Sequence, residues 1–172
     1  PIGIAQVGRV GRNEISPRQG MIRLRDFTIM EMEFFFDPES KTCPGLERVL
    51  DRRLRVRPYK VRLEGGEPKE YTVKELIDEG VVAHPCMAYW MTVGLDLVKY
   101  IGVREDETFF EEKGPNEKAH YATQVFDQLV KTVRWGWVEV AGYAYRGNYD
   151  LSRHMKYSGQ DLQVFEPYKE PR

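Results

Sequence analysis

The residues best suited to chemistry lie near the start of the chain, where arginines and glutamates flank a loop that contains Pro17 and Gly20. Side chains alternate across a strand, so residues of one parity share a face. Before the loop, Arg12 and Glu14 are both even, which places a cation and a carboxylate roughly 6.6 Å apart at the end of a strand. The charged residues after the loop are all odd: Arg23, Arg25, Glu31 and Glu33. A hairpin with this pattern is suited to hold a charged ligand.

The same charges have a simpler explanation, in which they form cross-strand salt bridges on a solvated face of a sheet. Exposed pairs of this kind contribute about 0 to 1 kcal/mol each. A cluster of charges is only probabilistic evidence of a site, so the residues alone leave both interpretations open.

The elements that position these charges follow from the apolar residues between them. Even positions after the loop are mostly apolar, which predicts a half-buried strand. They are Ile22, Leu24, Met30, Met32, Phe34 and Phe36, interrupted by Asp26 and Thr28. We therefore expect residues 2–37 to form a β-hairpin with one face in a core and the other charged. A further strand is expected over 136–145.

The middle of the chain has a different character. Residues 53–57 alternate as a strand does, and Gly65-Gly66 predicts a turn that strands at 61–63 and 71–73 could flank. Thr72 followed by Glu75 has the spacing of a capping box.

Three helices are expected in this part and after it. The capping box predicts a short helix that ends near Gly80. Apolar residues between Met87 and Val98 predict a buried helix that ends before Gly102. A third helix is expected to begin at Pro115-Asn116 and to continue to Val133.

Composition limits the class of protein. A chain of 172 residues can bury about 70% of its unfolded surface, which predicts one domain with a core. The net charge is only −1, so any contact with nucleic acid must come from local basic patches. Cys43 and Cys86 are far apart in sequence, which argues against a metal site and weakly for a reducing compartment.

No apolar run is long enough to cross a membrane, and no signal peptide is recognisable. We therefore expect a cytoplasmic protein with no membrane partner. The strand pattern begins directly at Pro1, which predicts that the chain is a fragment of a longer protein.

The stretch from Arg12-Asn-Glu-Ile-Ser-Pro-Arg to Ile-Met-Glu31-Met-Glu resembles motif 2 of class II aminoacyl-tRNA synthetases, in the form found in eukaryotic and archaeal glycyl-tRNA synthetases. The resemblance continues in Glu117-Lys-Ala-His-Tyr-Ala, Gly136-Trp-Val-Glu-Val-Ala-Gly and Arg146-Gly-Asn-Tyr-Asp-Leu-Ser-Arg-His154, and so covers nearly the whole chain. Gly11 departs from the family pattern, which usually has an aromatic residue there.

The resemblance implies an α+β fold, with the antiparallel sheet core of a class II synthetase and a helical and strand insertion. Residues 1–40 would be the motif 2 hairpin, 41–115 the insertion, and 116–172 a helix and strand that return to the core. The implied activity is glycine–tRNA ligation. Glycine is activated with ATP and Mg²⁺ to glycyl-adenylate, pyrophosphate is released, and glycine is transferred to the 3′ end of its tRNA.

The resemblance also implies which residues bind ATP. Arg12 would grip the α-phosphate and act in catalysis, because an arginine fork matches phosphate geometry. Glu14 would accept a hydrogen bond from the adenine amino group. The remaining ATP-binding positions are Asn13, Arg23, the backbone of Leu24, Glu139 and Val140, with Glu139 also near Mg²⁺. Arg25 and Asp26 match the motif too, with bracing of the loop as their alternative role.

Glycine has no side chain to grip, so its ammonium and carboxylate must be recognised. Glu31 matches the family position for the ammonium, and Arg146 matches an arginine near the carboxylate, with a structural ion pair as its alternative. Arg53, Arg55 and Arg57 lie in the most basic stretch and could meet tRNA phosphates, although a solvated strand face explains them equally well. For Glu117, His120 and Tyr121 we favour packing on one side of a helix beside the active site, with contact to the tRNA end as the alternative.

Several parts of the family are missing from the sequence, including motif 1, which forms the homodimer interface, and the motif 3 arginine. Two alternatives to the ligase therefore stay open. One is a non-catalytic nucleotide- or RNA-binding module derived from the same fold. The other is an activating enzyme with a similar core and a different acceptor.

Overall fold

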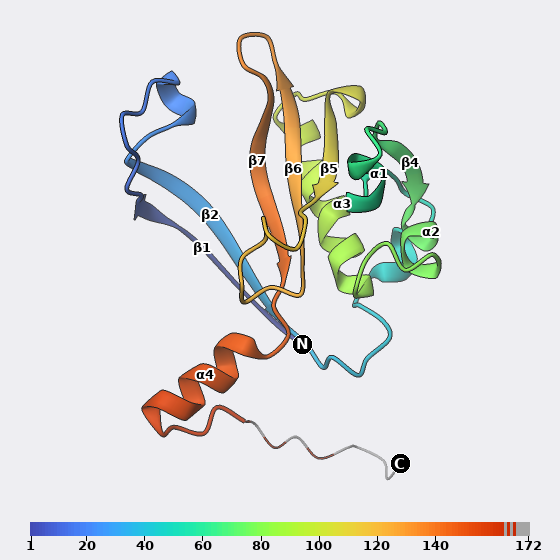
Figure 1. Cartoon of the computed structure of the whole chain (residues 1–172). Helices are drawn as coiled ribbons and strands as arrows, with labels where there is room; N and C mark the ends of the chain where they lie inside the picture. Colours follow the sequence, from blue (N-terminus) through green and yellow to red (C-terminus); the bar gives the residue numbers. More distant parts are fainter. Residues whose placement is uncertain (164, 166, 168–172) are drawn as a thin grey trace. The chain divides into compact units, whose positions relative to one another are not determined.

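The computed structural model describes residues 1–163, 165 and 167 and has an α+β fold (Figure 1). By its internal contacts the chain divides into two compact units, Pro1–Ser40 and Lys41–Arg172. Each unit is described by itself below.

The first unit is the expected β-hairpin. Strand β1 (Ile2–Gly11) pairs antiparallel with β2 (Asp26–Phe35), and a loop with a single 3-10 turn, η1 (Gly20–Ile22), joins them. The prediction that one strand carries all of the charges after the loop is wrong for Arg23 and Arg25. Both precede the first residue of β2, so strand parity does not place them on a face.

The apolar face expected for this hairpin is not buried within the unit. Met30 and Met32 are 63% and 44% exposed, although both stand at even positions that predicted a core. A two-stranded ribbon has no further layer to cover either face, and such ribbons are marginally stable alone. Alternation in the sequence identified the strand but could not show whether another layer covers it.

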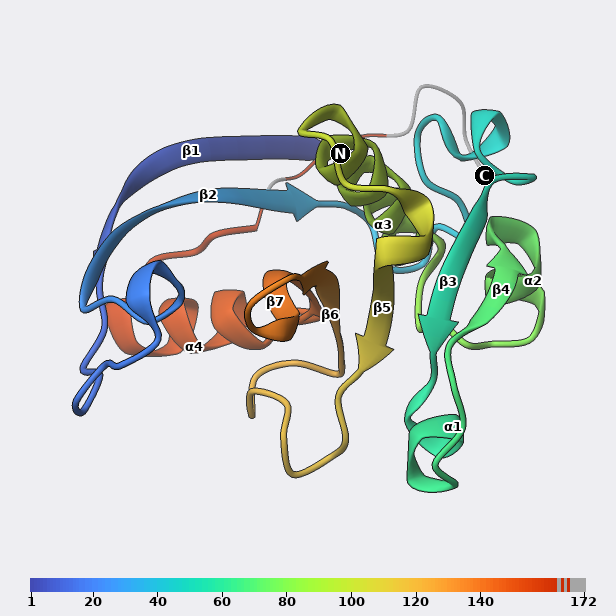
Figure 2. The ribbon, with the colours of Figure 1, turned by 90° about the horizontal axis from the view of Figure 1, so that it is seen from above.

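The second unit contains a five-stranded sheet in the order β4-β3-β5-β6-β7 (Figures 1 and 2). Its strands are β3 (Arg53–Arg57), β4 (Lys69–Thr72), β5 (Thr108–Glu112), β6 (Gln124–Thr132) and β7 (Gly136–Tyr145). Strands β3 and β5 are parallel, and the other neighbours are antiparallel. The sheet is therefore mixed, and its one parallel pair lies within residues 41–115, where an α+β insertion was expected. The α+β class is confirmed.

The helices of this unit are α1 (Tyr59–Leu63), α2 (Val73–Asp78), α3 (Pro85–Tyr100) and α4 (Tyr149–Ser158), with 3-10 turns η2 (Leu46–Arg48) and η3 (Glu105–Glu107). The capping box before α2 is confirmed, because the Thr72 hydroxyl accepts from the Glu75 amide and the Glu75 carboxylate accepts from the Thr72 amide. The buried helix that ends before Gly102 is confirmed as α3.

Two expectations for this unit are wrong. Residues 61–63 lie in α1 rather than in a strand, and Gly65 ends that helix with a positive φ of 71°. Residues 116–132 form a loop and then β6 rather than a helix. The spacing of Ala122, Phe126 and Leu129 imitates a helical stripe, but the segment pairs with strands on both sides, and that pairing decides its conformation.

The core of the unit lies between α3 and one face of the sheet (Figure 2). Five buried residues at even positions of β3, β5 and β6 supply the sheet side: Leu54, Val56, Phe110, Phe126 and Gln128. From β7, the Tyr143 hydroxyl donates to the Gln128 side chain at 2.8 Å. The backbone approaches closely at Gly94 of α3, where a Cβ atom would stand 1.6 Å from that hydroxyl.

Two buried thiols lie beside this core, although their cysteines are far apart in sequence. Cys43 precedes η2, Cys86 lies in the first turn of α3, and both are at most 2% exposed. The Cys86 Sγ donates to the carbonyl of Thr42 at 4.0 Å, and the two thiols are hydrogen-bond partners. Burial raises the pKa of both thiols, and it raises the pKa of the Tyr143 hydroxyl as well.

These shifts predict that the protein loses stability at alkaline pH. When a group's pKa is raised on folding, the unfolded chain releases its proton first, so stability falls as pH rises above the unfolded pKa. For the thiols that loss begins near the ordinary value of 9.0, at about 1.4 kcal/mol per pH unit for each group. Urea unfolding followed between pH 8 and 10 measures the slope. The double variant Cys43→Ala/Cys86→Ala should show a shallower slope, and an unchanged slope would contradict the assignment.

Candidate active site

Arg12 extends the hairpin ladder by one residue beyond β1. Its amide donates to the carbonyl of Arg25 at 2.8 Å, which fixes the backbone at the mouth of the loop. The guanidinium lies over the Phe27 ring, 5.3 Å from its centroid. Within the part of the chain that the structure describes, Arg12 forms no salt bridge, so its charge is available to an anion.

The loop beyond Arg12 is held by the residues that follow it. The Arg25 Nε donates to the carbonyl of Glu14 at 2.9 Å, and the Arg23 guanidinium stands 3.9 Å from the Glu14 carboxylate. Asp26 pairs with Arg9 at 2.5 Å on the opposite face of the hairpin. Arg25 thus braces the loop, whereas Asp26 joins the two strands. Glu14 and Arg23 lie close together on the loop.

The register of the hairpin brings the predicted phosphate and ammonium ligands onto one face. Val10 stands opposite Phe27 and Gln6 opposite Glu31, so even residues of β1 share a face with odd residues of β2. Arg12, stacked on Phe27, belongs to this face. The Gln6 side chain donates to the Glu31 carboxylate at 2.9 Å, which holds that carboxylate in place. Asn13 and Leu24 lie in the loop at the same end as Arg12.

In the second unit, Glu139 and Val140 lie on β7, and both are exposed. The register shifts between Gln128 and Leu129, so Ala141 and Glu139 have partners on β6 while Val140 stands at a bulge. Bulges re-aim side chains and recur beside active sites. Glu139 lies on the sheet face opposite α3, and so do Lys113 and Asp127. The Lys113 ammonium donates to the buried Asp127 carboxylate at 2.6 Å. That bond, with Glu139 adding to it, raises the pKa of Lys113.

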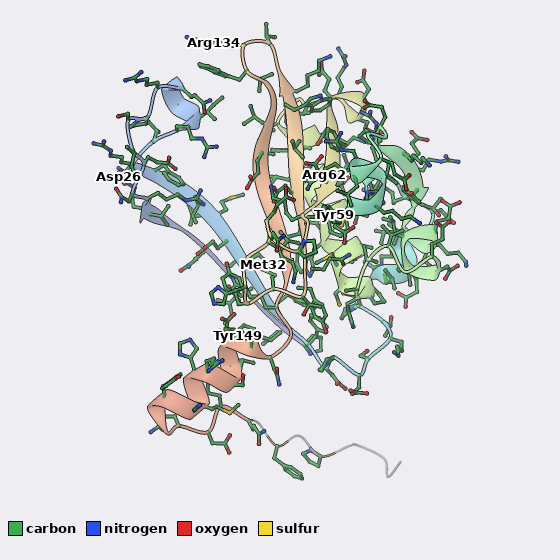
Figure 3. The ribbon with its side chains drawn as sticks, viewed as in Figure 1. Asp26, Met32, Tyr59, Arg62, Arg134 and Tyr149 are labelled. Atoms are coloured by element: carbon green, nitrogen blue, oxygen red, sulfur yellow. The ribbon has the colours of Figure 1, made fainter. Side chains whose placement is uncertain are left out.

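Arg146 lies at the end of β7 beside a large cavity. Its guanidinium is 3.2 Å from the Asp150 carboxylate and lies over the Tyr121 ring at 4.7 Å from the centroid. The ion pair that was the alternative role of Arg146 is thus present. The adjacent cavity has a volume of about 670 Å³, and its wall includes Arg146 and Tyr149. Tyr149 is the first residue of α4 (Figure 3).

The loop that carries Tyr121 is held by charge rather than by a helix. Arg62 of α1 pairs with Glu117, whose carboxylate also accepts from the Gly114 amide at 2.8 Å. Figure 3 labels Arg62 beside Tyr59, and the guanidinium lies over that ring. The expectation that Glu117, His120 and Tyr121 share one side of a helix is therefore wrong, because no helix forms there.

The three arginines of β3 have protein partners. Arg53 pairs with Glu70 at 3.2 Å, Arg57 pairs with Glu111, and Arg55 donates to the carbonyl of Asp106 at 2.6 Å. These contacts fit the solvated strand face better than a tRNA contact, which stays a prediction. Glu139 as a Mg²⁺ ligand also stays a prediction. Among the described residues, no three histidine, cysteine or acidic side chains are grouped so that they could hold a metal by themselves.

Sequence reasoning missed the basic residues around the cavity near Arg146. They are Lys118, Arg153 and Lys156, and they come from the loop before β6 and from α4. One signal was available in the spacing of Ser152, Arg153 and Lys156, which recur at three and four residues on one face of a helix. The contribution of Lys118 could not be found, because that part of the chain was assigned to a helix.

Comparison with known proteins decides the family. A glycine–tRNA ligase of Aeropyrum pernix is 59% identical over 99% of this chain, and one of Thermococcus sibiricus is 44% identical over all 172 residues of this chain. One of Pyrococcus furiosus is also 44% identical over the whole length. The chain is homologous to part of the glycine–tRNA ligases. It spans about 30% of the length of these relatives. No family model matches the chain.

This homology bears out the resemblance on which the residue assignments depend. The assignments themselves stay predictions, as do the proposed domain boundaries. None of the helices that the structure describes is long and apolar enough to span a membrane.

Proposed function

We propose that the protein to which this chain belongs is a glycine–tRNA ligase, and that the chain contributes part of a class II catalytic core. In the proposed reaction a glycine carboxylate oxygen attacks the α-phosphorus of ATP, and the bond to pyrophosphate breaks. A hydroxyl of the terminal ribose of the tRNA then attacks the carbonyl carbon of the glycyl-adenylate, and AMP leaves. The face of the hairpin that carries Arg12 and Glu31 is the observation that supports this proposal best.

The spacing on that face suits an amino acid joined to a phosphate. Arg12 reaches to the level of Phe27, and Glu31 lies four residues further along β2, which is roughly 13 Å. An extended glycyl group on a phosphorus spans about 5 Å, and a hydrogen bond of about 3 Å at each end brings the total to about 11 Å. A guanidinium at one end and a carboxylate at the other are the groups that an α-phosphate and an ammonium require.

The loop next to Arg12 supplies groups for the rest of the nucleotide. Arg23 and Glu14 lie together there, so the carboxylate can accept from the adenine amino group while the cation lies against the nucleotide. Asn13 and the backbone of Leu24 would complete this part. In the second unit, the family resemblance assigns Arg146 to the glycine carboxylate, and Glu139 and Val140 to the triphosphate.

Glu139 can serve as one ligand of a Mg²⁺ ion whose other ligands come from ATP and water. Mg²⁺ in nucleotide sites commonly takes one or two carboxylates and fills its remaining positions with phosphate oxygens and water. Glu139 can supply one such oxygen, since it is exposed on β7. The ion, when bound, neutralises charge on the leaving pyrophosphate. We also propose that the intact protein is a cytoplasmic homodimer, by analogy with the family that the sequence resembles.

The test is glycine-dependent ATP–pyrophosphate exchange, measured on this chain and on the Aeropyrum pernix relative with this chain's sequence in place of the matching residues. We expect exchange from the grafted protein and little from the chain alone. In the graft, Glu31→Gln should raise the KM for glycine by about 10- to 100-fold, because a charged hydrogen bond to the ammonium is lost. The KM for ATP should change little.

Glu33→Gln is the matched control, because it removes the same charge as Glu31→Gln. Glu33 lies two residues further along the same face of β2. It should leave the KM for glycine within about twofold, because exposed charges at this distance are strongly screened. Equal effects of the two variants would show that Glu31 has no specific role. Absence of exchange in the grafted protein would overturn the ligase proposal and favour a non-catalytic binding module.

A further inference from the structure

The cavity beside Arg146 has more positive charge than glycine needs. Four cations contribute to its wall, Lys118, Arg146, Arg153 and Lys156, and no carboxylate does. The chain as a whole has a net charge of −1, so this concentration is local. Glycine has a single carboxylate, and Arg146 alone could meet it. The three further cations suit a ligand with more negative charge.

Those three cations are held by groups that leave their charge unneutralised. Lys118 donates to the backbone carbonyl of Ala122, Arg153 lies 5.3 Å over the Tyr149 ring, and the Lys156 ammonium is 5.6 Å from the Tyr157 ring centroid. In the described part of the chain, none of the three forms a salt bridge. A carbonyl or an aromatic face orients a cation without cancelling its charge, so an anion can still bind.

The cavity also differs from a glycine pocket in size and in lining. Its volume of about 670 Å³ is in the range of sites for whole cofactors or drug-sized ligands. His120 meets Tyr121 and Tyr149 edge to face, with ring centroids 5.4 and 5.6 Å apart. Aromatic rings among cations are the usual means by which proteins bind single-stranded nucleic acid, through stacked bases and neutralised phosphates.

Three parts of the second unit build the cavity. The loop before β6 supplies Lys118 and Tyr121, the turn after β7 supplies Arg146, and α4 supplies Tyr149, Arg153 and Lys156. On α4 the wall residues recur at intervals of three and four, so one face of the helix is directed at the cavity. The cations thus surround the cavity from different elements.

We propose that Lys118, Arg153 and Lys156 form a binding site for backbone phosphates of single-stranded RNA, which here is the 3′ end of the tRNA. The identity of this RNA rests on the proposed function. The phosphates of ATP could bind the same three cations. The test below therefore distinguishes RNA phosphates from ATP phosphates. Direct contact between Arg146 and RNA is not part of the proposal.

The first arm measures RNA binding by fluorescence anisotropy, with the complete chain and a labelled single-stranded RNA that ends in CCA. The triple variant Lys118→Gln/Arg153→Gln/Lys156→Gln should bind at least about tenfold more weakly. The slope of log K against log salt should become shallower by about 2, since each contact with a single-strand phosphate contributes about 0.7. The matched control is Lys74→Gln/Lys99→Gln/Arg104→Gln, which removes the same charge from cations that pair with carboxylates elsewhere in the unit. It should change binding by less than about twofold, as expected of exposed and screened charges.

The second arm uses the grafted relative and measures exchange, which needs no tRNA, beside aminoacylation. The triple variant should keep its KM for ATP and its exchange rate, and should raise the KM for tRNA. A raised KM for ATP with unchanged RNA binding would assign the cations to ATP phosphates and overturn the proposal. Equal weakening of RNA binding in the triple variant and the control, or no change in either, would also overturn it. If the grafted wild type shows no exchange, the ligase proposal fails, whereas the anisotropy arm still decides whether this cavity binds RNA.

Discussion

Arg12→Ala is expected to reduce glycine-dependent exchange by about a thousandfold or more in the grafted relative, with a small effect on the KM for glycine. Charge builds on the phosphoryl oxygens as pyrophosphate leaves, and a fixed guanidinium stabilises that charge more in the transition state than in bound ATP. Arg12 is preorganised for this role by its backbone bond to Arg25 and by the Phe27 ring beneath it. The loss should therefore fall mainly on kcat.

Arg9 provides a matched control on the same hairpin. It is an arginine three residues earlier, on the opposite face, and it already pairs with Asp26 at 2.5 Å. Arg9→Ala removes the same charge and a similar apolar stem, yet it should change exchange by less than about threefold, because an exposed pair of this kind contributes about 1 kcal/mol at most. If the two variants lose activity equally, the effect is general destabilisation of the hairpin, and Arg12 has no special role in the transition state.

Lysine at position 12 separates charge from geometry. Arg12→Lys keeps a cation but loses the planar fork that matches two phosphate oxygens at once. We expect it to recover only part of the loss. Full recovery would mean that net charge at the end of the hairpin is sufficient.

The parts of this fold that sequence predicted well are those where local signals decide the structure. The alternation in residues 26–35 identified β2, and the reciprocal capping of Thr72 and Glu75 identified the start of α2. Both depend on side chains close in sequence. Arg12 and Glu31 were assigned from family resemblance. Strand parity applies to Glu31 in β2, whereas Arg12 lies one residue beyond β1 and is placed by its contact with the Phe27 ring. That the two share one face required the register of the hairpin.

The features that could not be predicted from sequence depend on pairing between segments that are distant along the chain. The segment 124–132 became a strand because β5 and β7 flank it, against a spacing that favours a helix. The same error hid the cavity near Arg146. Lys118 and Lys156 are far apart along the chain and meet only because the β6–β7 hairpin returns the chain to its starting point. Cys43 and Cys86 meet for a similar reason, through the packing of η2 on α3.

Gly94→Ala should be among the most destabilising single substitutions in the second unit. Alanine is the better helix former by about 1 kcal/mol, so propensity alone predicts a gain at this interior position of α3. The added Cβ, however, would stand 1.6 Å from the Tyr143 hydroxyl and 2.8 Å from the ring carbon that bears it. The ring cannot move away easily, since its hydroxyl donates to Gln128, which is 1% exposed. Either α3 or β7 must shift, and we expect a loss of about 3 kcal/mol or more.

Urea unfolding followed by the fluorescence of Trp90 and Trp137 reports on α3 and β7 directly. Val93→Ala is the control, because it changes the adjacent and partly exposed residue of the same helix and should shift stability by less than about 1 kcal/mol. A fall of similar size in both variants would mean that α3 tolerates no change here for reasons unrelated to the contact with Tyr143.

The double variant Gly94→Ala/Tyr143→Phe tests the steric cause itself. Tyr143→Phe alone should cost about 1 kcal/mol, because the Gln128 carbonyl loses its donor. Combined with Gly94→Ala it removes the atom that the new methyl group would overlap, so the double variant should be more stable than the sum of the two single losses predicts. Recovery should be partial, since the ring carbon 2.8 Å away remains. Simple additivity would show that the hydroxyl is not what limits the approach of α3 to the sheet.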